Sequence, residues 1–273
     1  MDELDNIKIV FIDIDGTLVN DEKEVSLATS SAIQRIVNKG IYVVITSGRD
    51  LVHTINMSKN ANCSPIVISC GGGIIYNYEK NDIIFADLFD FAKVKLVWDY
   101  CLDNEVGLIL KSNTTVYYNK YSLVTSGLEY KLISDISEIT DTTISHFLIM
   151  SDCYDKINNV YKYVSSLGMF VTSLSSSYLD NTVSDYYSID VNDSNVSKGT
   201  AVNYLLNYLN LKKEESMSFG DYINDLDMFS SCGVNIAMGN SCSEIKEKAD
   251  FITKSNNEDG VAWFLNKYLW LWR

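Results

Sequence analysis

Hydrophobic residues in the first third of the chain form short continuous runs that alternate with stretches of helical spacing. Residues 8–14, 41–46 and 65–70 are rich in Val and Ile, and such runs predict strands buried on both faces. Residues 26–38 and 50–59 place apolar side chains three and four positions apart, which predicts amphipathic helices. Buried strands separated by helices are typical of a parallel sheet covered by helices on both faces.

The pattern changes after three consecutive glycines at residues 71–73. Residues 74–76 predict the returning arm of a hairpin, and the segment from 79 to 188 is rich in Tyr, Ser and Thr, with more regular apolar-polar alternation. This segment predicts an α+β insertion. Its predicted strands are 106–111, 114–119, 144–150, 169–175 and 183–191, and its predicted helices are 91–104 and 154–167.

The first pattern returns after the insertion. The predicted helices are 198–209, 226–231, 243–249 and 259–269, and the predicted strands are 216–221, 234–238 and 251–252. We therefore predict an α/β fold with a doubly wound, Rossmann-like parallel sheet core. Residues 1–78 and 189–273 form this core, and a large inserted α+β cap domain occupies residues 79–188. The apolar tail at 268–273 favours docking onto the core over an oligomer or membrane contact.

Composition narrows the class of partner. A formal net charge of −14 argues against a nucleic-acid binder, because phosphate backbones select Lys and Arg. No basic and apolar leader and no apolar run near about 18 residues is present, so we expect a cytoplasmic protein without a membrane partner. Six scattered cysteines without a C-x-x-C pair, and only His53 and His146, argue against a zinc or redox centre. Neither composition nor motifs indicate an oligomeric state.

Two carboxylates follow the first buried run. Asp13 and Asp15 are one residue apart, and two like charges in one small volume favour a cation between them. A hard divalent ion with oxygen ligands, most simply Mg²⁺, fits this pair. The alternative is that both residues only form a turn, since Asp-Gly is a common turn sequence.

Three later segments add groups that phosphoryl chemistry requires. Ser47 and Gly48 offer a hydroxyl and backbone N–H groups at a helix start, where phosphate binds well. Lys198 starts another helix, where its charge opposes the helix dipole, and Asp221 and Asp225 follow another core strand. The alternatives are a helix N-cap at Ser47, a solvated Lys198 and simple helix capping by one of the acids.

Taken together, these segments resemble the motifs of haloacid dehalogenase-like phosphatases of the Cof type. The matching residues are 13–18 (Asp-Ile-Asp-Gly-Thr-Leu), 47–49 (Ser-Gly-Arg), 197–199 (Ser-Lys-Gly), 220–225 (Gly-Asp-x-x-Asn-Asp) and 257–262 (Asn-Glu-Asp-Gly-Val-Ala). They occur in the family's order and span essentially the whole chain. The resemblance implies that the inserted domain is a cap that selects the substrate.

The resemblance also implies a role for each matching residue. Asp13 is the nucleophile that forms an aspartyl-phosphate, while Asp15 protonates the leaving oxygen and later activates water. Asp13, the Asp15 backbone carbonyl and Asp221 hold Mg²⁺, and Asp225 supports them from behind. The phosphoryl group is held by the Ser47 side chain, by Lys198 and Asn224, and by the backbone of Ile14 and Gly48. As the group that protonates the leaving oxygen, Asp15 would work best with its pKa raised toward neutrality.

The expected function is a Mg²⁺-dependent phosphatase that acts on small phosphorylated metabolites such as sugar phosphates or phosphorylated cofactors. The alternatives are a phosphohexomutase-like transferase and a non-catalytic sensor on the same fold. Two departures from the family pattern stand out. Gly71 takes the place of the common Asn in the turn at 70–73, and Ser47 replaces the commoner Thr, with Thr46 beside it as the other candidate hydroxyl.

Overall fold

The computed structural model describes residues 6–122, 130–178, 185–193 and 196–269. The chain forms two compact units. Unit 1 comprises Met1–Arg49, His53–Phe85 and Ser197–Arg273, and unit 2 comprises Asp50–Val52 and Ala86–Val196.

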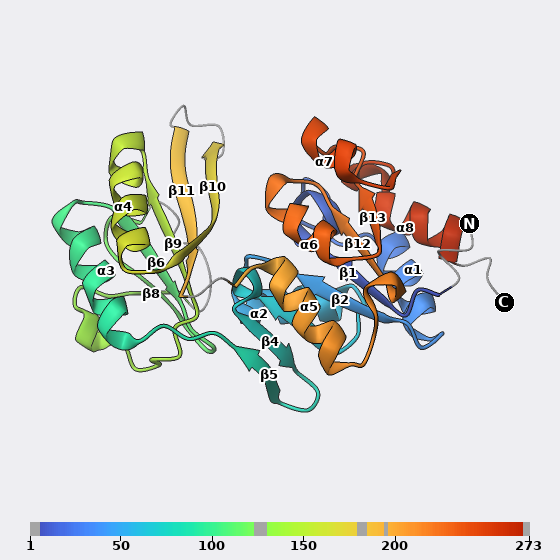
Figure 1. The fold of residues 1–273 in the computed structure, drawn as a ribbon, viewed down its shortest axis with the longest axis horizontal. Helices are drawn as coiled ribbons and strands as arrows, with labels where there is room; N and C mark the ends of the chain where they lie inside the picture. Colours follow the sequence, from blue (N-terminus) through green and yellow to red (C-terminus); the bar gives the residue numbers. More distant parts are fainter. Residues whose placement is uncertain (1–5, 123–129, 179–184, 194–195, 270–273) are drawn as a thin grey trace. The chain divides into compact units, whose positions relative to one another are not determined.

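Unit 1 is built on an eight-stranded sheet with the order β14-β13-β12-β1-β2-β3-β4-β5. The strands from β14 to β3 are parallel, and β4 runs antiparallel to β3. Figure 1 labels the central strands β1, β2 and β12 of this sheet. Strand order reverses beside β1, which lies between β2 and β12. The strands are β1 (Ile9–Ile12), β2 (Tyr42–Thr46), β3 (Ile66–Ser69), β4 (Ile74–Asn77), β5 (Asp82–Ala86), β12 (Ser216–Gly220), β13 (Val234–Ala237) and β14 (Phe251–Ile252).

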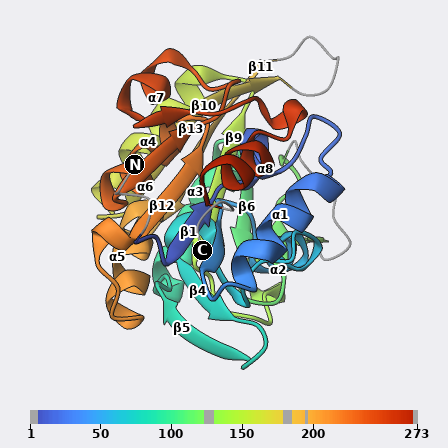
Figure 2. The same cartoon turned by 90° about the vertical axis from the view of Figure 1, so that its right-hand side faces the viewer.

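Helices cover both faces of this sheet, as Figure 2 shows, with α5, α6 and α7 on one side of β1 and α1 and α8 on the other. Ile9 and Phe11 point toward the first group and share a buried core with its residues. Val10 and Ile12 alternate to the opposite face. The helices are α1 (Leu27–Val37), α2 (Leu51–Asn60), α5 (Lys198–Tyr208), α6 (Leu226–Ser231), α7 (Ser243–Lys248) and α8 (Gly260–Phe264), which continues as a turn at Leu265–Leu269.

Unit 2 is a six-stranded sheet with the order β10-β11-β9-β6-β7-β8 and two helices. The helices α3 and α4 pack on one face, where Trp98, Phe147 and Ile149 are among the buried residues. The helices are α3 (Phe91–Asp103) and α4 (Tyr154–Ser166), and the strands are β6 (Gly107–Lys111), β7 (Val116–Tyr118), β8 (Tyr130–Leu132), β9 (His146–Ser151), β10 (Phe170–Tyr178) and β11 (Asp185–Asn192).

The predicted α/β fold class is confirmed, and the predicted helices and strands occur within a few residues of their expected bounds. Two strands were not predicted. β5 carries two exposed residues at its start, and β8 is three residues long with two exposed, so neither has a clear apolar pattern. β5 extends the first sheet past residue 78, and the division into a core and a cap at residues 79 and 188 stays a prediction.

The end of the described chain packs on unit 1. The Tyr268 ring lies 4.5 Å from that of Phe264 and 5.9 Å from that of Phe251 in β14, measured between ring centroids. The rest of the aromatic tail, residues 270–273, and the start of the predicted strand 183–191 lie outside the described residues.

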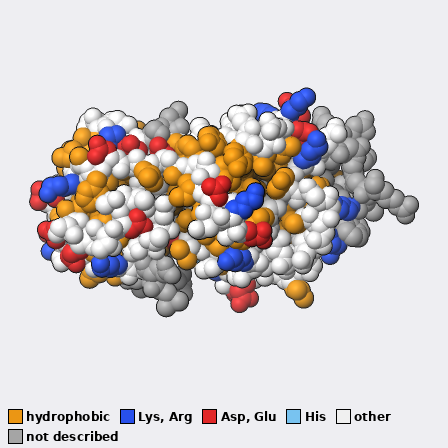
Figure 3. Space-filling view, turned by 90° about the horizontal axis from the view of Figure 1, so that it is seen from below, with side chains coloured by type: hydrophobic (Ala, Val, Ile, Leu, Met, Phe, Trp, Pro, Cys, Tyr) orange, Lys and Arg blue, Asp and Glu red, His pale blue; other side chains and the backbone are white. Residues whose placement is uncertain are grey.

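Charge on the described surface shows no basic stripe on the face in Figure 3, where Lys and Arg side chains are scattered among acidic and uncharged ones. Within the described ranges, no helix combines the length and apolar character that crossing a bilayer requires.

Candidate active site

The first acidic motif lies where β1 ends beside β12. Strand β1 stops at Ile12, one residue before Asp13, whose backbone N–H donates to the Phe219 carbonyl of β12 (3.2 Å). The chain then forms a turn at Ile14–Leu18, with Gly16 at a φ of 75°. A Cβ on Gly16 would lie 2.3 Å from Asp221 Oδ2, so only glycine allows this approach. The turn therefore brings the Asp13 segment against the loop that follows β12.

Lys198 joins two of the predicted acids in the interior of unit 1. Its Nζ lies 2.6 Å from Asp13 Oδ1 and 2.7 Å from Asp225 Oδ1. All three residues are buried, with Lys198 only 4% exposed. One carboxylate oxygen each from Asp13, Asp221 and Asp225 lie within 4.8 Å of one another. Four residues that the sequence placed at separate strand and helix ends thus meet in one cluster.

Two close approaches hold Lys198 in this place. Ser197 caps α5 by accepting from the Thr200 N–H (3.2 Å), and the Gly199 N–H donates to Asp227 Oδ2 (3.0 Å). A Cβ on Gly199 would lie 2.4 Å from the Asp227 carbonyl oxygen, so a larger residue would push the helix start away. The first residue of α5 is therefore fixed by backbone contacts, and its side chain extends to the carboxylates.

The charges of this cluster are only partly balanced. Burial raises the pKa of Asp13 well above its ordinary value; Lys198 opposes that rise, while Asp225 and Asp221 add to it. Burial alone would lower the pKa of Lys198, but the Asp13 and Asp225 carboxylates raise it well above its usual range. Burial and Asp225 raise the pKa of Asp221 to about 6. Three carboxylates facing one ammonium leave room for a divalent cation.

The hydrogen bonds distinguish Asp221 from Asp225. Asp225 Oδ2 accepts from the N–H groups of Asp221 (3.0 Å) and Tyr222 (3.3 Å), and its Oδ1 accepts from Lys198, so both oxygens are occupied. Asp221 Oδ1 accepts from the Thr17 hydroxyl (2.8 Å). A metal ion would therefore be held by Asp13 and Asp221, with Asp225 orienting the loop. Thr17 received no role from the sequence, although it lies inside the first motif.

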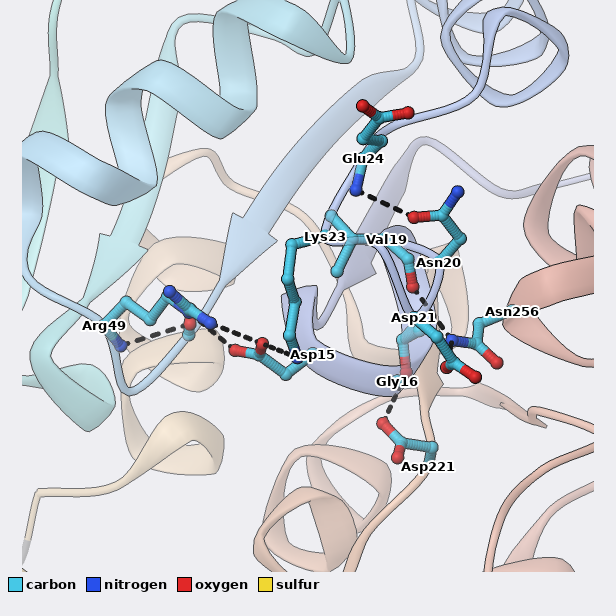
Figure 4. A network of polar contacts seen from close by, with 12 residues as sticks. Asp15, Gly16, Val19, Asn20, Asp21, Lys23, Glu24, Arg49, Asp221 and Asn256 are labelled. Atoms are coloured by element: carbon cyan, nitrogen blue, oxygen red, sulfur yellow. Dashed lines mark hydrogen bonds and ion pairs between the residues drawn. The ribbon is translucent and has the colours of Figure 1, made fainter. Parts of the chain in front are cut away.

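Asp15 points to cations rather than to this cluster. Arg49 Nε lies 2.6 Å from Asp15 Oδ2, Arg49 Nη2 lies 2.5 Å from Oδ1, and Lys23 Nζ lies 3.1 Å from Oδ1 (Figure 4). Partial burial acts to raise the pKa of Asp15, but Arg49 and Lys23 outweigh it and lower that pKa to about 2. The expected rise toward neutrality is therefore wrong for this arrangement. Arg49 lies in the matching segment 47–49, but the resemblance gave it no role. No feature of the sequence indicated a role for Lys23.

The other predicted phosphate ligands lie around the same strand ends. Ser47 is buried just after β2, and its hydroxyl accepts from the Arg49 N–H (3.2 Å). The neighbouring Thr46 Oγ1 is buried and has no hydrogen-bond partner among the described residues. Asn224 is exposed in the turn Ile223–Asp225. The roles given to Ser47, Gly48, Asn224 and the Ile14 backbone stay predictions.

The glycine turn at 70–73 approaches both the end of β2 and the start of α5. Gly71 has a φ of 66°, and its N–H donates to the Ser47 carbonyl (3.1 Å). A Cβ on Gly72 would lie 2.2 Å from the Ser197 carbonyl oxygen. The turn therefore packs between the residues that follow β2 and the start of α5, and residue 71 provides no amide side chain there.

Comparison with known proteins finds relatives that match almost the whole chain. The family model for haloacid dehalogenase-like hydrolases matches residues 10–265. The 5-amino-6-(5-phospho-D-ribitylamino)uracil phosphatase YcsE of Bacillus subtilis is 30% identical, with 94% of each chain covered. The phosphatase YwtE of the same organism, named for the same substrate, is 29% identical over 96% of this chain and 98% of its own. The crystal structure of TM0651 from Thermotoga maritima has a TM-score of 0.77 at 26% identity, covering 96% of this chain and 97% of that one.

Proposed function

This chain belongs to the haloacid dehalogenase-like hydrolase family and is a phosphatase. We propose that it hydrolyses small phosphomonoesters through a Mg²⁺-dependent reaction with an aspartyl-phosphate intermediate. One observation carries the proposal. Lys198 bridges Asp13 and Asp225 at 2.6 and 2.7 Å, while Asp221 completes a carboxylate cluster within 4.8 Å. Phosphoryl transfer needs positioned cations around a nucleophile more than it needs acid-base strength.

Asp13 is the nucleophile in this proposal. Its Oδ1 is held by Lys198, which leaves the second oxygen for attack on the phosphorus atom. The bond from Asp13 to phosphorus forms as the ester oxygen leaves, and water then cleaves the acyl phosphate to regenerate the carboxylate. Lys198 offsets charge on the transferring group and keeps the nucleophile in one orientation.

The donor set fits Mg²⁺. Asp13 and Asp221 would hold the ion, with the Asp15 backbone carbonyl as the third protein ligand, because hard divalent ions prefer carboxylate and carbonyl oxygens. When bound, the ion screens the carboxylates against the phosphate dianion. Burial is the main cause of the raised pKa values of Asp13 and Asp221, and neighbouring carboxylates add to both, so a bound cation would stabilise the ionised forms.

Asp15 supplies and removes protons. In the present arrangement its carboxylate is paired with Arg49 and Lys23, and a carboxyl with a pKa of about 2 is ionised at neutral pH. An ionised Asp15 suits the second half-reaction, in which it accepts a proton from the attacking water. Protonating the leaving oxygen in the first half-reaction requires Asp15 to leave these cations.

The substrate is a phosphorylated small metabolite whose leaving group is selected by unit 2, acting as the cap. Phosphorylated sugars, sugar alcohols and cofactors carry such leaving groups. The relatives YcsE and YwtE, each named for a phosphorylated ribitylaminouracil, support a polyol phosphate as the first compound to test.

The test is phosphate release from p-nitrophenyl phosphate and from a panel of polyol and sugar phosphates, with and without Mg²⁺. We expect Mg²⁺-dependent turnover that the Asp13→Asn substitution abolishes. An exposed-site control, Asn207→Ala on α5, should turn over like the wild type. Wild-type rates in the Asp13→Asn protein would refute the proposed nucleophile.

A further inference from the structure

The C-terminal motif at 257–262 and its neighbour Asn256 have no place in the chemistry described above, yet they contact the loop beside Asp15. Asn256 Nδ2 donates to the Val19 carbonyl (3.1 Å) and to Asp21 Oδ1 (3.2 Å). Asn257 and Asp21 form a reciprocal pair: the Asp21 N–H donates to Asn257 Oδ1 (3.0 Å), and Asn257 Nδ2 donates to Asp21 Oδ2 (2.8 Å). These contacts join segments more than 230 residues apart in the sequence.

The loop that they hold is a tight five-residue turn, seen in Figure 4. The Asn20 and Glu24 backbones bond to each other (3.1 Å), Asn20 Oδ1 accepts from the Glu24 N–H (2.8 Å), and the Lys23 N–H donates to the Asn20 carbonyl (3.0 Å). Lys23 has a φ of 63°, in the left-handed region that non-glycine residues rarely adopt. Such a conformation persists only where its surroundings impose it, and such residues concentrate at functional sites.

The strained residue is also the one that contacts Asp15. Lys23 Nζ lies 3.1 Å from Asp15 Oδ1, the same oxygen that Arg49 contacts. A lysine side chain on a free loop would sample many rotamers, so a fixed backbone limits where its ammonium can lie. The other end of the segment is held too, since Asn240 Nδ2 donates to the Gly16 carbonyl (2.8 Å) and Asn240 Oδ1 accepts from the Asn256 N–H (3.0 Å).

We propose that Asn256 and Asn257 are positioning residues for catalysis: by holding Asp21 they fix the loop 20–24, and through Lys23 they set the orientation of the Asp15 carboxylate. The inference rests on the proposed acid-base role of Asp15. Neither asparagine touches substrate or the reacting atoms. Asn257 contacts this segment through Asp21, so its effect on the reaction passes through Lys23 and disappears when Lys23 is removed.

The test compares two substrates of similar shape, phenyl phosphate and p-nitrophenyl phosphate. Phenolate is the poorer leaving group and depends more on proton transfer from Asp15. The readout is the kcat for phenyl phosphate divided by the kcat for p-nitrophenyl phosphate. Both values are measured in one preparation, so any loss of folded protein cancels in the ratio. Lys23→Met should change this ratio roughly two- to five-fold, the range expected for loss of a half-exposed ion pair. Asn257→Ala should change it in the same direction by a similar factor, with KM for both substrates unchanged.

The double variant decides between the proposal and a merely structural role. Asn257→Ala combined with Lys23→Met should give the ratio of Lys23→Met alone. Asp21→Ala, which removes the side-chain contacts to both asparagines, should change the ratio in the same direction as Asn257→Ala. The exposed controls Asn207→Ala and Lys248→Met should keep the wild-type ratio. An unchanged ratio in Lys23→Met or Asn257→Ala, or two effects that multiply in the double variant, would overturn the proposal. Inactivity of the wild type on both substrates would instead overturn the proposed function.

Discussion

Replacing Lys198 by Met tests the energetic centre of the site. The substitution removes a cation that is 4% exposed and that pairs with Asp13 at 2.6 Å and with Asp225 at 2.7 Å. Removing one partner of a buried ion pair leaves an uncompensated buried charge and costs about 3–5 kcal/mol of stability. Two carboxylates lose their partner here, so we expect a loss at the upper end of that range in the absence of Mg²⁺.

The matched control lies in the same unit. Lys8 Nζ is 2.6 Å from Glu215 Oε1, the same distance as the Lys198–Asp13 pair, but its side chain is 58% exposed. Because water screens exposed pairs, Lys8→Met should change the free energy of unfolding only slightly. Both variants are compared with the wild type by urea unfolding at equilibrium.

The pH dependence of the difference gives a second readout. Without Lys198 the pKa of Asp13 rises further in the folded state, because Lys198 opposes the rise that burial causes, so the folded protein binds more protons than the unfolded chain. Stability of the variant relative to the wild type should then improve as the pH falls from about 8 to about 5. A loss no larger than that of Lys8→Met, or a loss that grows on acidification, would refute the electrostatic reasoning.

Three further predictions concern the turn, a buried histidine and the metal. Gly16→Ala forces a Cβ to 2.3 Å from Asp221 Oδ2 and should lower kcat by about a hundredfold. Gly40→Ala is the control, because Gly40 also has a positive φ, 86°, but a Cβ there would have no heavy atom of the described residues within 4 Å, so kcat should be unchanged. Equal kcat values in the two variants would contradict the steric argument. Burial and Lys111 lower the pKa of His146 in unit 2 to about 4 against an ordinary 6.5, so the unfolded chain binds the proton first, and stability should fall by about 3 kcal/mol as the pH drops through that window. Urea unfolding at several pH values gives the free energy of unfolding as a function of pH. If that free energy falls as steeply with acidification in His146→Asn as in the wild type, the assignment to His146 is wrong. Saturating Mg²⁺ should raise the thermal unfolding midpoint of the wild type but not of Asp221→Asn, and an equal rise in both, measured by calorimetry, would remove Asp221 from the metal site.

The sequence predicts the architecture and the centre of the site for the same physical reason. Continuous apolar runs identify buried parallel strands, and polar residues directly after such runs lie at one edge of the sheet. Asp13 and Asp221 follow β1 and β12, which are neighbours in the sheet, so their meeting follows from strand order. Lys198 joins them because Gly199 lets the start of α5 approach closely.

The parts that the sequence does not predict depend on side-chain direction beyond the strand ends. The direction of Asp15 is decided by the turn at Gly16 and by cations from two other segments, Arg49 and Lys23. The contacts between Asp21 and Asn257 could not be predicted from the sequence either, because neither residue lies in a segment with a helix or strand pattern of apolar residues. Edge strands such as β5 escape prediction for a related reason, since exposure removes the apolar alternation.

The claim that the phosphoryl group passes through Asp13 is tested most directly by trapping it there. Wild-type protein is quenched with acid during turnover of phenyl phosphate with Mg²⁺, and its peptides are mapped by mass spectrometry. We predict one phosphoryl group on the peptide that contains Asp13, and none on the corresponding peptide of Asp13→Asn. A phosphoryl group on a different peptide, or a wild-type digest free of phosphoaspartate while phosphate is being released, would contradict the account.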